Sequence, residues 1–169
     1  CQFVENQIFV TGAVDIRNIE DERIYVYERN DNEATLVRSF LQPNQSNDGF
    51  YDLAYDGHKL FGGEKRQIND STSALVIVEF DLNGNNVRPI FLDVDPDVLV
   101  SPYALAYNPR DSTLITTRRE KDIYVFNMEG ELVNQVDLFV PGEVLDVQGL
   151  AWNDDDDDDM PLYIIDYGV

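Results

Sequence analysis

The stretch Val147-Gln148-Gly149-Leu150-Ala151-Trp152-Asn153 decides the fold of this chain, because two earlier segments repeat its pattern. Each copy reads Leu-Ala-aromatic-Asp/Asn and is followed by a turn and a short apolar run. Aromatic and β-branched side chains favour extended strands, so each copy predicts a strand, a turn and a second strand. The copies are residues 149–153 with 161–166, residues 52–57 with 60–64, and residues 104–109 with 114–117.

A second motif recurs with the same period. It begins with Ile and ends in an aromatic residue followed by Glu, Asp or Asn, at residues 24–28, 77–81 and 123–127. These segments are 53 and 46 residues apart, and the alanines of the first motif are 52 and 45 residues apart. A repeat of roughly 40–50 residues with four short strands is typical of a β-propeller blade. The fourth strand of each unit is expected at residues 35–40, 87–91 and 132–136.

Turn chemistry and residue size agree with this architecture. The dipeptides Asn83-Gly84 and Glu129-Gly130 separate apolar runs, as expected where a hairpin needs a positive φ. The run at residues 24–27 lacks polar alternation, which is typical of a strand covered on both faces. We expect the small Ala of the Leu-Ala motif to let the innermost strands crowd near the ring axis.

We therefore predict an all-β, β-propeller-like chain with four-stranded antiparallel blades, about three and a half in number. Residues 1–169 form a single, partial domain. A closed propeller typically has about 4–8 blades, so we expect a partial ring, or a ring completed by a partner or by a longer chain. The blades are expected at residues 1–48 (partial, without a first strand), 49–98, 99–144 and 145–169 (partial).

Charge excludes some classes of partner. The chain has 12 basic and 33 acidic residues, for a net charge of −21. Nucleic-acid binding needs a basic surface, and anionic membranes attract basic segments, so neither partner is expected. No apolar run approaches the roughly 20 residues of a transmembrane helix. The acidity is compatible with cations, with basic partners or with highly solvated loops.

Nucleophilic catalysis has little support in the sequence. His58 is the only histidine and Cys1 the only cysteine, so neither a Ser-His-Asp nor a Cys-His arrangement is indicated. One cysteine forms no disulfide framework. Its place at residue 1 leaves a lipidated cysteine open as an alternative to a trimmed chain. No glycine-rich phosphate loop is present, and we predict no catalytic residue and no certain cofactor.

Two groups of aspartates are candidate Ca²⁺ ligands, because hard cations prefer oxygen ligands. Residues 154–159 are six consecutive carboxylates, for which the alternative is a solvated, self-repelling loop. Aspartates also alternate at residues 93–97, where Pro96 predicts a loop. Residues 81–86 carry alternating oxygen side chains, but their glycine falls where a hairpin turn needs it. The candidate metal ligands are Asp93, Asp95, Asp97, Asp154, Asp156 and Asp158.

A polar channel mouth is a second candidate site. Glu64, Arg118 and Asp166 fall at equivalent ends of the predicted second strands. Ligands of propellers often bind where such strand ends meet the central channel, although these residues could equally cap exposed strands. Asp56, in the first predicted turn, completes the channel-mouth candidates.

The repeats resemble those of secreted bacterial β-propeller proteins with G-L-A-[YW]-D blades, of the kind that carry sorting domains. Residues 149–153 and 161–166 are similar to one such blade, and residues 52–57 and 122–126 follow the same pattern. The resemblance implies secretion, an extracellular or cell-surface setting, and a binding or structural role. It implies no catalytic residue.

We therefore expect a non-enzymatic extracellular module that binds protein or carbohydrate at the cell surface, or that assembles into a homo-oligomer or filament. The alternative is a Ca²⁺-dependent hydrolase or lactonase of the six-bladed type. In that alternative the ion would be held by Asp56, Glu64 and Asp166.

Overall fold

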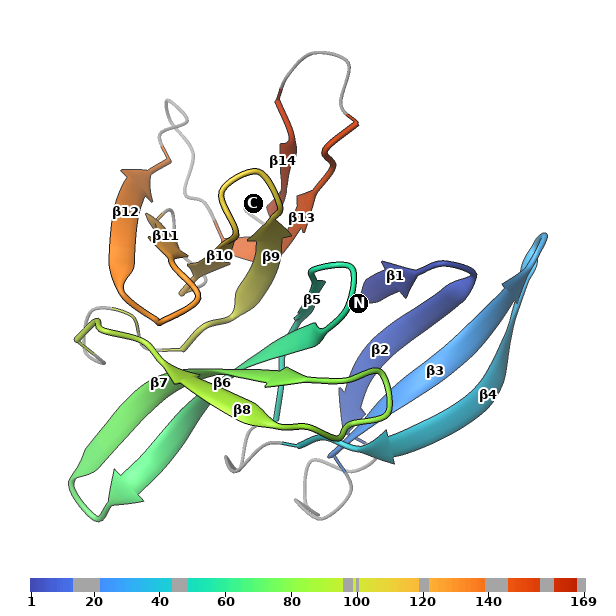
Figure 1. Cartoon of the computed structure of the whole chain (residues 1–169), viewed down its shortest axis with the longest axis horizontal. Helices are drawn as coiled ribbons and strands as arrows, with labels where there is room; N and C mark the ends of the chain where they lie inside the picture. Colours follow the sequence, from blue (N-terminus) through green and yellow to red (C-terminus); the bar gives the residue numbers. More distant parts are fainter. Residues whose placement is uncertain are drawn as a thin grey trace.

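The computed structural model describes residues 1–13, 22–43, 49–95, 99, 101–118, 122–138, 146–155 and 160–166. These residues form fourteen β-strands and no helix (Figure 1). The predicted all-β class is therefore confirmed. Within the described ranges, no helix is long and apolar enough to cross a membrane.

The strands form four antiparallel sheets, each built from strands consecutive in the chain. The fourth sheet has two strands and the other three have four. The first sheet comprises β1 (Gln2–Val4), β2 (Gln7–Ala13), β3 (Glu22–Asn30) and β4 (Glu33–Leu41); the second, β5 (Leu53–Tyr55), β6 (Leu60–Asn69), β7 (Thr72–Phe80) and β8 (Arg88–Phe91). The third comprises β9 (Ala104–Asn108), β10 (Thr113–Thr117), β11 (Asp122–Phe126) and β12 (Leu132–Asp137); the fourth, β13 (Val147–Trp152) and β14 (Leu162–Asp166).

The prediction that the first unit lacks its first strand is wrong. Strand β1 pairs with β2 and places Gln2 opposite Phe9, just as Ala54 lies opposite Phe61 in the second sheet. Cys1-Gln2-Phe3 therefore takes the place of the Leu-Ala-aromatic motif. Only its aromatic residue is retained, so the sequence pattern did not identify the strand.

The sheets stack in chain order, and each junction buries an apolar core. Phe9 and Ile24 of the first sheet pack against Leu60 and Phe80 of the second. Phe61 and Ile77, on the opposite face of the second sheet, pack with residues of the third. A third cluster joins the third and fourth sheets. Alternate side chains of a strand point to opposite faces, so the second and third sheets are buried on both faces.

The first strands of successive sheets lie next to one another. Strand β1 contacts β5, β5 contacts β9, and β9 contacts β13, so these strands form a continuous inner row (Figure 1). Ala54 and Ala106 are buried within it, 1% and 3% exposed. The expectation that a small residue lets these strands crowd agrees with this burial, whereas Ala151 in the last strand is exposed. The described residues do not form a closed ring.

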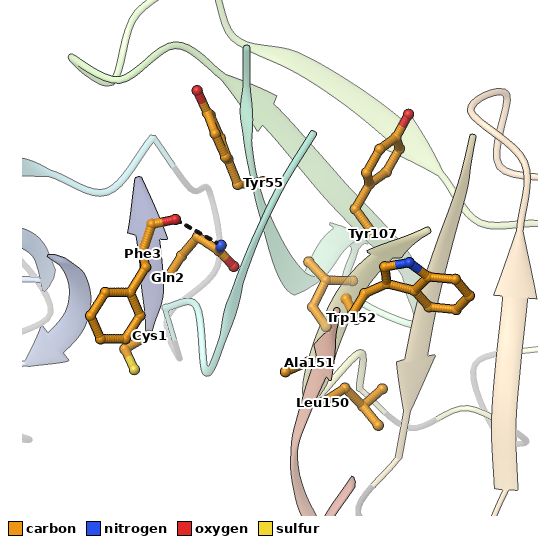
Figure 2. Close-up of a pocket in the computed structure, with 10 residues that line it drawn as sticks. Cys1, Gln2, Phe3, Tyr55, Tyr107, Leu150, Ala151 and Trp152 are labelled. Carbon is orange, nitrogen blue, oxygen red and sulfur yellow. Dashed lines mark hydrogen bonds between the residues drawn. The ribbon is translucent and has the colours of Figure 1, made fainter. Parts of the chain in front are cut away.

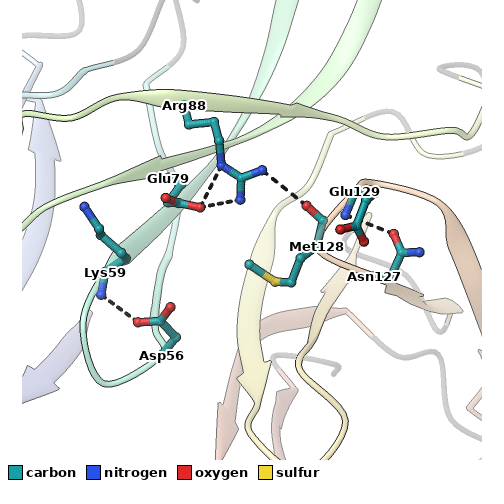
Figure 3. Close-up of polar contacts among 7 residues, drawn as sticks. All are labelled: Asp56, Lys59, Glu79, Arg88, Asn127, Met128 and Glu129. Carbon is teal, nitrogen blue, oxygen red and sulfur yellow. Dashed lines mark hydrogen bonds and ion pairs between the residues drawn. The ribbon is translucent and has the colours of Figure 1, made fainter.

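Hairpin turns join neighbouring sheets at their outer edges. Gly84, between β7 and β8, lies against Phe40 of the first sheet, and Gly130, between β11 and β12, lies against Phe91 of the second. Arg88 pairs with Glu79 on the neighbouring strand of its own sheet. It also donates a hydrogen bond across the second junction to the Met128 carbonyl (Figure 3). Both predicted glycine turns have positive φ, +80° and +90°.

Candidate functional site

The inner row of first strands surrounds a pocket of about 260 Å³. In Figure 2, Gln2 and Phe3 lie on one side of this pocket, and Ala151 and Trp152 lie on the other. All four sheets contribute to the lining, which is formed by Cys1, Gln2, Phe3, Tyr55, Leu105, Ala106, Tyr107, Leu150, Ala151 and Trp152.

The aromatic residue of the repeat lines this pocket in every sheet. Phe3, Tyr55, Tyr107 and Trp152 occupy one register position, because each lies opposite the equivalent apolar residue of the second strand. These opposite residues are Ile8, Leu60, Leu114 and Leu162. The four residues therefore share one pocket, although three of the rings also pack between sheets: Tyr55 lies against the core of the first junction, Tyr107 against that of the second and Trp152 against that of the third. We call Phe3, Tyr55, Tyr107 and Trp152 the aromatic set.

A second hollow adjoins this pocket at the turn end of the first strands, and we call it the mouth. It is more open, has a volume of about 240 Å³, and shares Tyr55, Tyr107 and Trp152 with the first. The Tyr55 hydroxyl donates a hydrogen bond to the Gly57 carbonyl at 2.7 Å, which places this hydroxyl at the turn. The Tyr107 side chain points the same way (Figure 2). The turns contribute Asp56, Gly57, Pro109 and Asp154 to the mouth.

The Asp or Asn that follows each aromatic residue shapes its turn. Asp56 Oδ1 accepts hydrogen bonds from the backbone N–H of His58 at 2.7 Å and of Lys59 at 2.6 Å. Figure 3 shows the bond from Lys59. Asn108 and Asn153 accept the equivalent bond from the residue two positions on. Such side chains reproduce a backbone turn locally. The Asp/Asn position is therefore structural, and only Asp56 adds a negative charge to it.

Arg110 holds the start of the acidic run at the mouth. Its Nε donates to Asp154 Oδ1 at 2.7 Å, and its guanidinium carbon lies 5.9 Å from the centre of the Trp152 ring. The hydrogen bond from Arg110 holds the pKa of Asp154 below its ordinary value. An ion pair thus links the turn of the third sheet to the loop of the fourth.

The mouth disfavours additional negative charge. The pKa of the Tyr55 hydroxyl is raised, first by burial and then by the charges of Asp56 and Glu5. A tyrosine hydroxyl is protonated at neutral pH even without this shift, so the raised pKa reports the burial and the negative field at this place. A positive group placed beside Tyr55 would meet the same field with the opposite sign.

The structure separates Asp56 from the other predicted channel-mouth residues. Asp56 lies at the pocket mouth, whereas Glu64 pairs with Val76 in the middle of β6, beyond Gly62 and therefore past the other end of β5. Glu64 is buried and accepts a hydrogen bond from Arg66 Nε at 2.6 Å. Arg118 lies 3.8 Å from Asp122, and Asp166 accepts a bond from the Asp146 backbone N–H.

The predicted calcium ligands are placed only in part. Asp97, Asp156 and Asp158 lie outside the described residues. Asp93 and Asp95 lie in an irregular segment after β8, as expected. In the part of the chain that the structure describes, no three His, Cys, Asp or Glu side chains gather closely enough to hold a metal ion. Calcium binding stays a prediction for the acidic loop.

The repeated aromatic residue is the one signal in the sequence for the aromatic set. The aromatic residue after Ala recurs in three Leu-Ala motifs, where the spacing indicates a repeated strand position. Convergence on one pocket depends on the stacking of the sheets, and the contribution of Phe3 depends on the register of β1.

Comparison with known sequences assigns no function to this site. No protein-family model matches it, and no curated protein matches it in sequence. The likeness to secreted propeller repeats therefore rests on the repeat motifs alone.

Proposed function

We propose that this chain is a non-enzymatic, extracellular β-propeller-like module that binds its ligand at the aromatic set. The single observation that carries the proposal is the convergence of Phe3, Tyr55, Tyr107 and Trp152 on one pocket from equivalent strand positions. Pockets lined by aromatic side chains with a few polar groups are typical of ligand sites.

Two features of the sheets support the propeller-like arrangement. The first strands lie side by side in chain order, as the innermost strands of a propeller do. Equivalent hairpin turns also contact the preceding sheet at both junctions, through Gly84 and Gly130. The extracellular setting is supported by the resemblance of the G-L-A-W-N repeat to secreted proteins.

Tryptophan fluorescence tests this proposal directly, because Trp152 is the only tryptophan of the chain and lines the pocket. We would titrate the protein with three sets of compounds: oligosaccharides, short peptides and small organic cations. At least one compound is expected to change the Trp152 emission with saturation.

A Tyr55→Leu variant is expected to lose at least tenfold in affinity, because one aromatic wall is removed while the fold is kept. The matched control is Tyr163→Leu, a half-exposed tyrosine of β14 that does not line the pocket. A saturable response that survives Tyr55→Leu unchanged, or no response to any of the three sets, would refute the pocket as the binding site.

Assembly with a second copy of this chain is a second candidate function. Ile165 on β14 is 64% exposed, whereas Gly63 and Thr117 at the equivalent positions are buried. Phe3, on the first strand, is 54% exposed. A sheet from another copy could pack on the exposed face of β14 in the way that neighbouring sheets pack at the three internal junctions. Light scattering should then give a dimer or larger mass that Ile165→Asp reduces; a monomeric wild-type chain at high concentration would contradict assembly.

A further inference from the structure

We propose that the aromatic set binds an organic cation, an ammonium or guanidinium head group on an apolar body. This inference rests on the proposed binding function and adds the chemical class of the ligand. The juxtaposition that carries it is an aromatic pocket whose mouth is lined by the carboxylates of Asp56 and Asp154.

The mouth already holds one organic cation, the guanidinium of Arg110. This group pairs with Asp154 at 2.7 Å and lies over the Trp152 ring at 5.9 Å. Aromatic faces attract cations through their quadrupole, most strongly for tryptophan and tyrosine. The contact of Arg110 with Trp152 is therefore an example, within the chain, of the contact that we propose for a ligand.

Among the described residues, no arginine or lysine lies over the ring of Tyr55 or Tyr107. Both rings line the pocket and its mouth. Asp56 adjoins Tyr55 in the chain and is partly buried at the turn. Phe61 stacks on the Tyr107 ring, with 6.0 Å between the ring centroids, so a cation beside the two tyrosines would meet the Tyr55 ring, the part of Tyr107 that Phe61 leaves uncovered, and the Asp56 carboxylate.

The charge around the mouth favours a cation over a neutral ligand. Glu5 and Asp56 act on the Tyr55 hydroxyl, whereas Asp154 at the mouth is already paired with Arg110. The chain as a whole carries a net charge of −21. A field of this sign concentrates cations and speeds their association, with an effect that falls as salt is added.

The deciding experiment compares two probes of the same shape and different charge. Choline carries a trimethylammonium group, and 3,3-dimethyl-1-butanol carries a neutral tert-butyl group in its place. We would follow both by the fluorescence of Trp152 and by NMR at low ionic strength. Choline is expected to bind at least about tenfold more tightly than the neutral alcohol, in keeping with cation–π attraction in a partly desolvated site.

The matched variant is Asp56→Asn, which removes the charge and keeps the turn. Asn108 and Asn153 already make this turn at the equivalent positions, so folding is expected to be unaffected. Affinity for choline should fall about three- to tenfold, while affinity for the neutral alcohol should stay the same. An Arg-containing tripeptide, capped at both ends, is the third probe and separates a protein side chain from a free small molecule as the natural source.

Each outcome decides between the two proposals. Equal binding of choline and the neutral alcohol, or binding of oligosaccharides only, would overturn the cation inference and leave the pocket function in place. Failure of every probe, oligosaccharides included, would overturn both. Preference for choline that Asp56→Asn abolishes would support the cation inference. A tripeptide that binds at least tenfold more tightly than choline would identify a basic protein side chain as the ligand.

Discussion

Two equivalent hairpins, one at each junction between the four-stranded sheets, perform the same task with different chemistry. In the turn between β7 and β8, Asp81 Oδ1 accepts hydrogen bonds from the N–H groups of Asn83 and Asn85, both at 2.9 Å. In the turn between β11 and β12, Asn127 Oδ1 accepts the same pair of bonds, from Glu129 and Glu131 at 3.1 and 2.9 Å. The turn needs an oxygen acceptor at this position, and either residue provides it.

The hairpins differ in what lies against the glycine. A Cβ on Gly84 would lie 2.6 Å from the Phe40 ring, whereas a Cβ on Gly130 would lie 2.0 Å from the Phe91 carbonyl oxygen. A side chain can rotate away, but a carbonyl in a strand moves only with its backbone. Similar local sequences therefore give junctions of different rigidity, and the following variants test that difference.

The largest effect is expected for Gly130→Ala. A positive φ costs a residue with a Cβ about 1–2 kcal/mol, and forced overpacking adds about 1–3 kcal/mol. We expect a total loss of about 2–5 kcal/mol, or on the order of 10 °C in Tm for a chain of this length. Thermal unfolding by circular dichroism measures it.

The control for backbone strain alone is Gly57→Ala, since Gly57 has a φ of +98° and no atom within 4 Å of the added Cβ. If Gly130→Ala lowers the Tm no more than Gly57→Ala does, the backbone at Phe91 moves aside without a cost in stability.

Gly84→Ala is expected to have an intermediate effect of about 2 kcal/mol, because the Phe40 ring can move aside. The same Tm measurement on the double variant Gly84→Ala/Phe40→Leu should recover part of the loss, since the smaller side chain leaves room for the methyl group. Additive effects of the two changes would contradict a direct contact between them.

Two arginines at equivalent positions of the fourth strands offer a smaller comparison. Arg38 Nη1 donates to Asn83 at 3.0 Å and lies 5.6 Å from two phenylalanine rings. Arg88 is 51% exposed and lies 3.5 Å from the Met128 carbonyl. We expect Arg38→Ala to cost about 1 kcal/mol and Arg88→Ala about half of that. Urea unfolding measures both, and a reversed order would place the stronger link at the second junction.

The smallest effect concerns pH. The pKa of Asp81 is lowered, chiefly by the hydrogen bond from the Asn85 backbone. A carboxyl group whose pKa is lower in the folded chain stabilises it above the unfolded pKa, and this stabilisation is lost as the pH falls through the folded pKa. Between pH 6 and pH 2.5, wild-type Tm should therefore fall by on the order of 1 °C more than that of Asp81→Asn. If the Tm of the two proteins falls equally with pH, the charge of Asp81 adds no stability beyond what an asparagine gives at this turn.

Much of the fold was predictable, because strand positions depend on local sequence. The Leu-Ala-aromatic and Ile-x-x-aromatic motifs placed the strands of the second, third and fourth sheets, and glycine marked both hairpins. Strand β1 was missed because Cys1 and Gln2 replace Leu and Ala. The candidate site was less predictable: Asp56 was named among the channel-mouth residues, but the aromatic set was not, because its residues come together only when the sheets stack.

By itself, the sequence determined the all-β class, the period, the turn acceptors and the charge, since these follow from side-chain shape, backbone preference and composition. Only the tertiary structure decided which side chains meet. Equivalent strand positions converge because the sheets stack in register, and this brings Phe3 and Trp152, far apart in the chain, to one pocket. The antiparallel pairing of β5 with β6 separates Asp56 from Glu64, which the sequence analysis had placed in one site. Packing between sheets is a sum of many weak contacts that no single segment encodes.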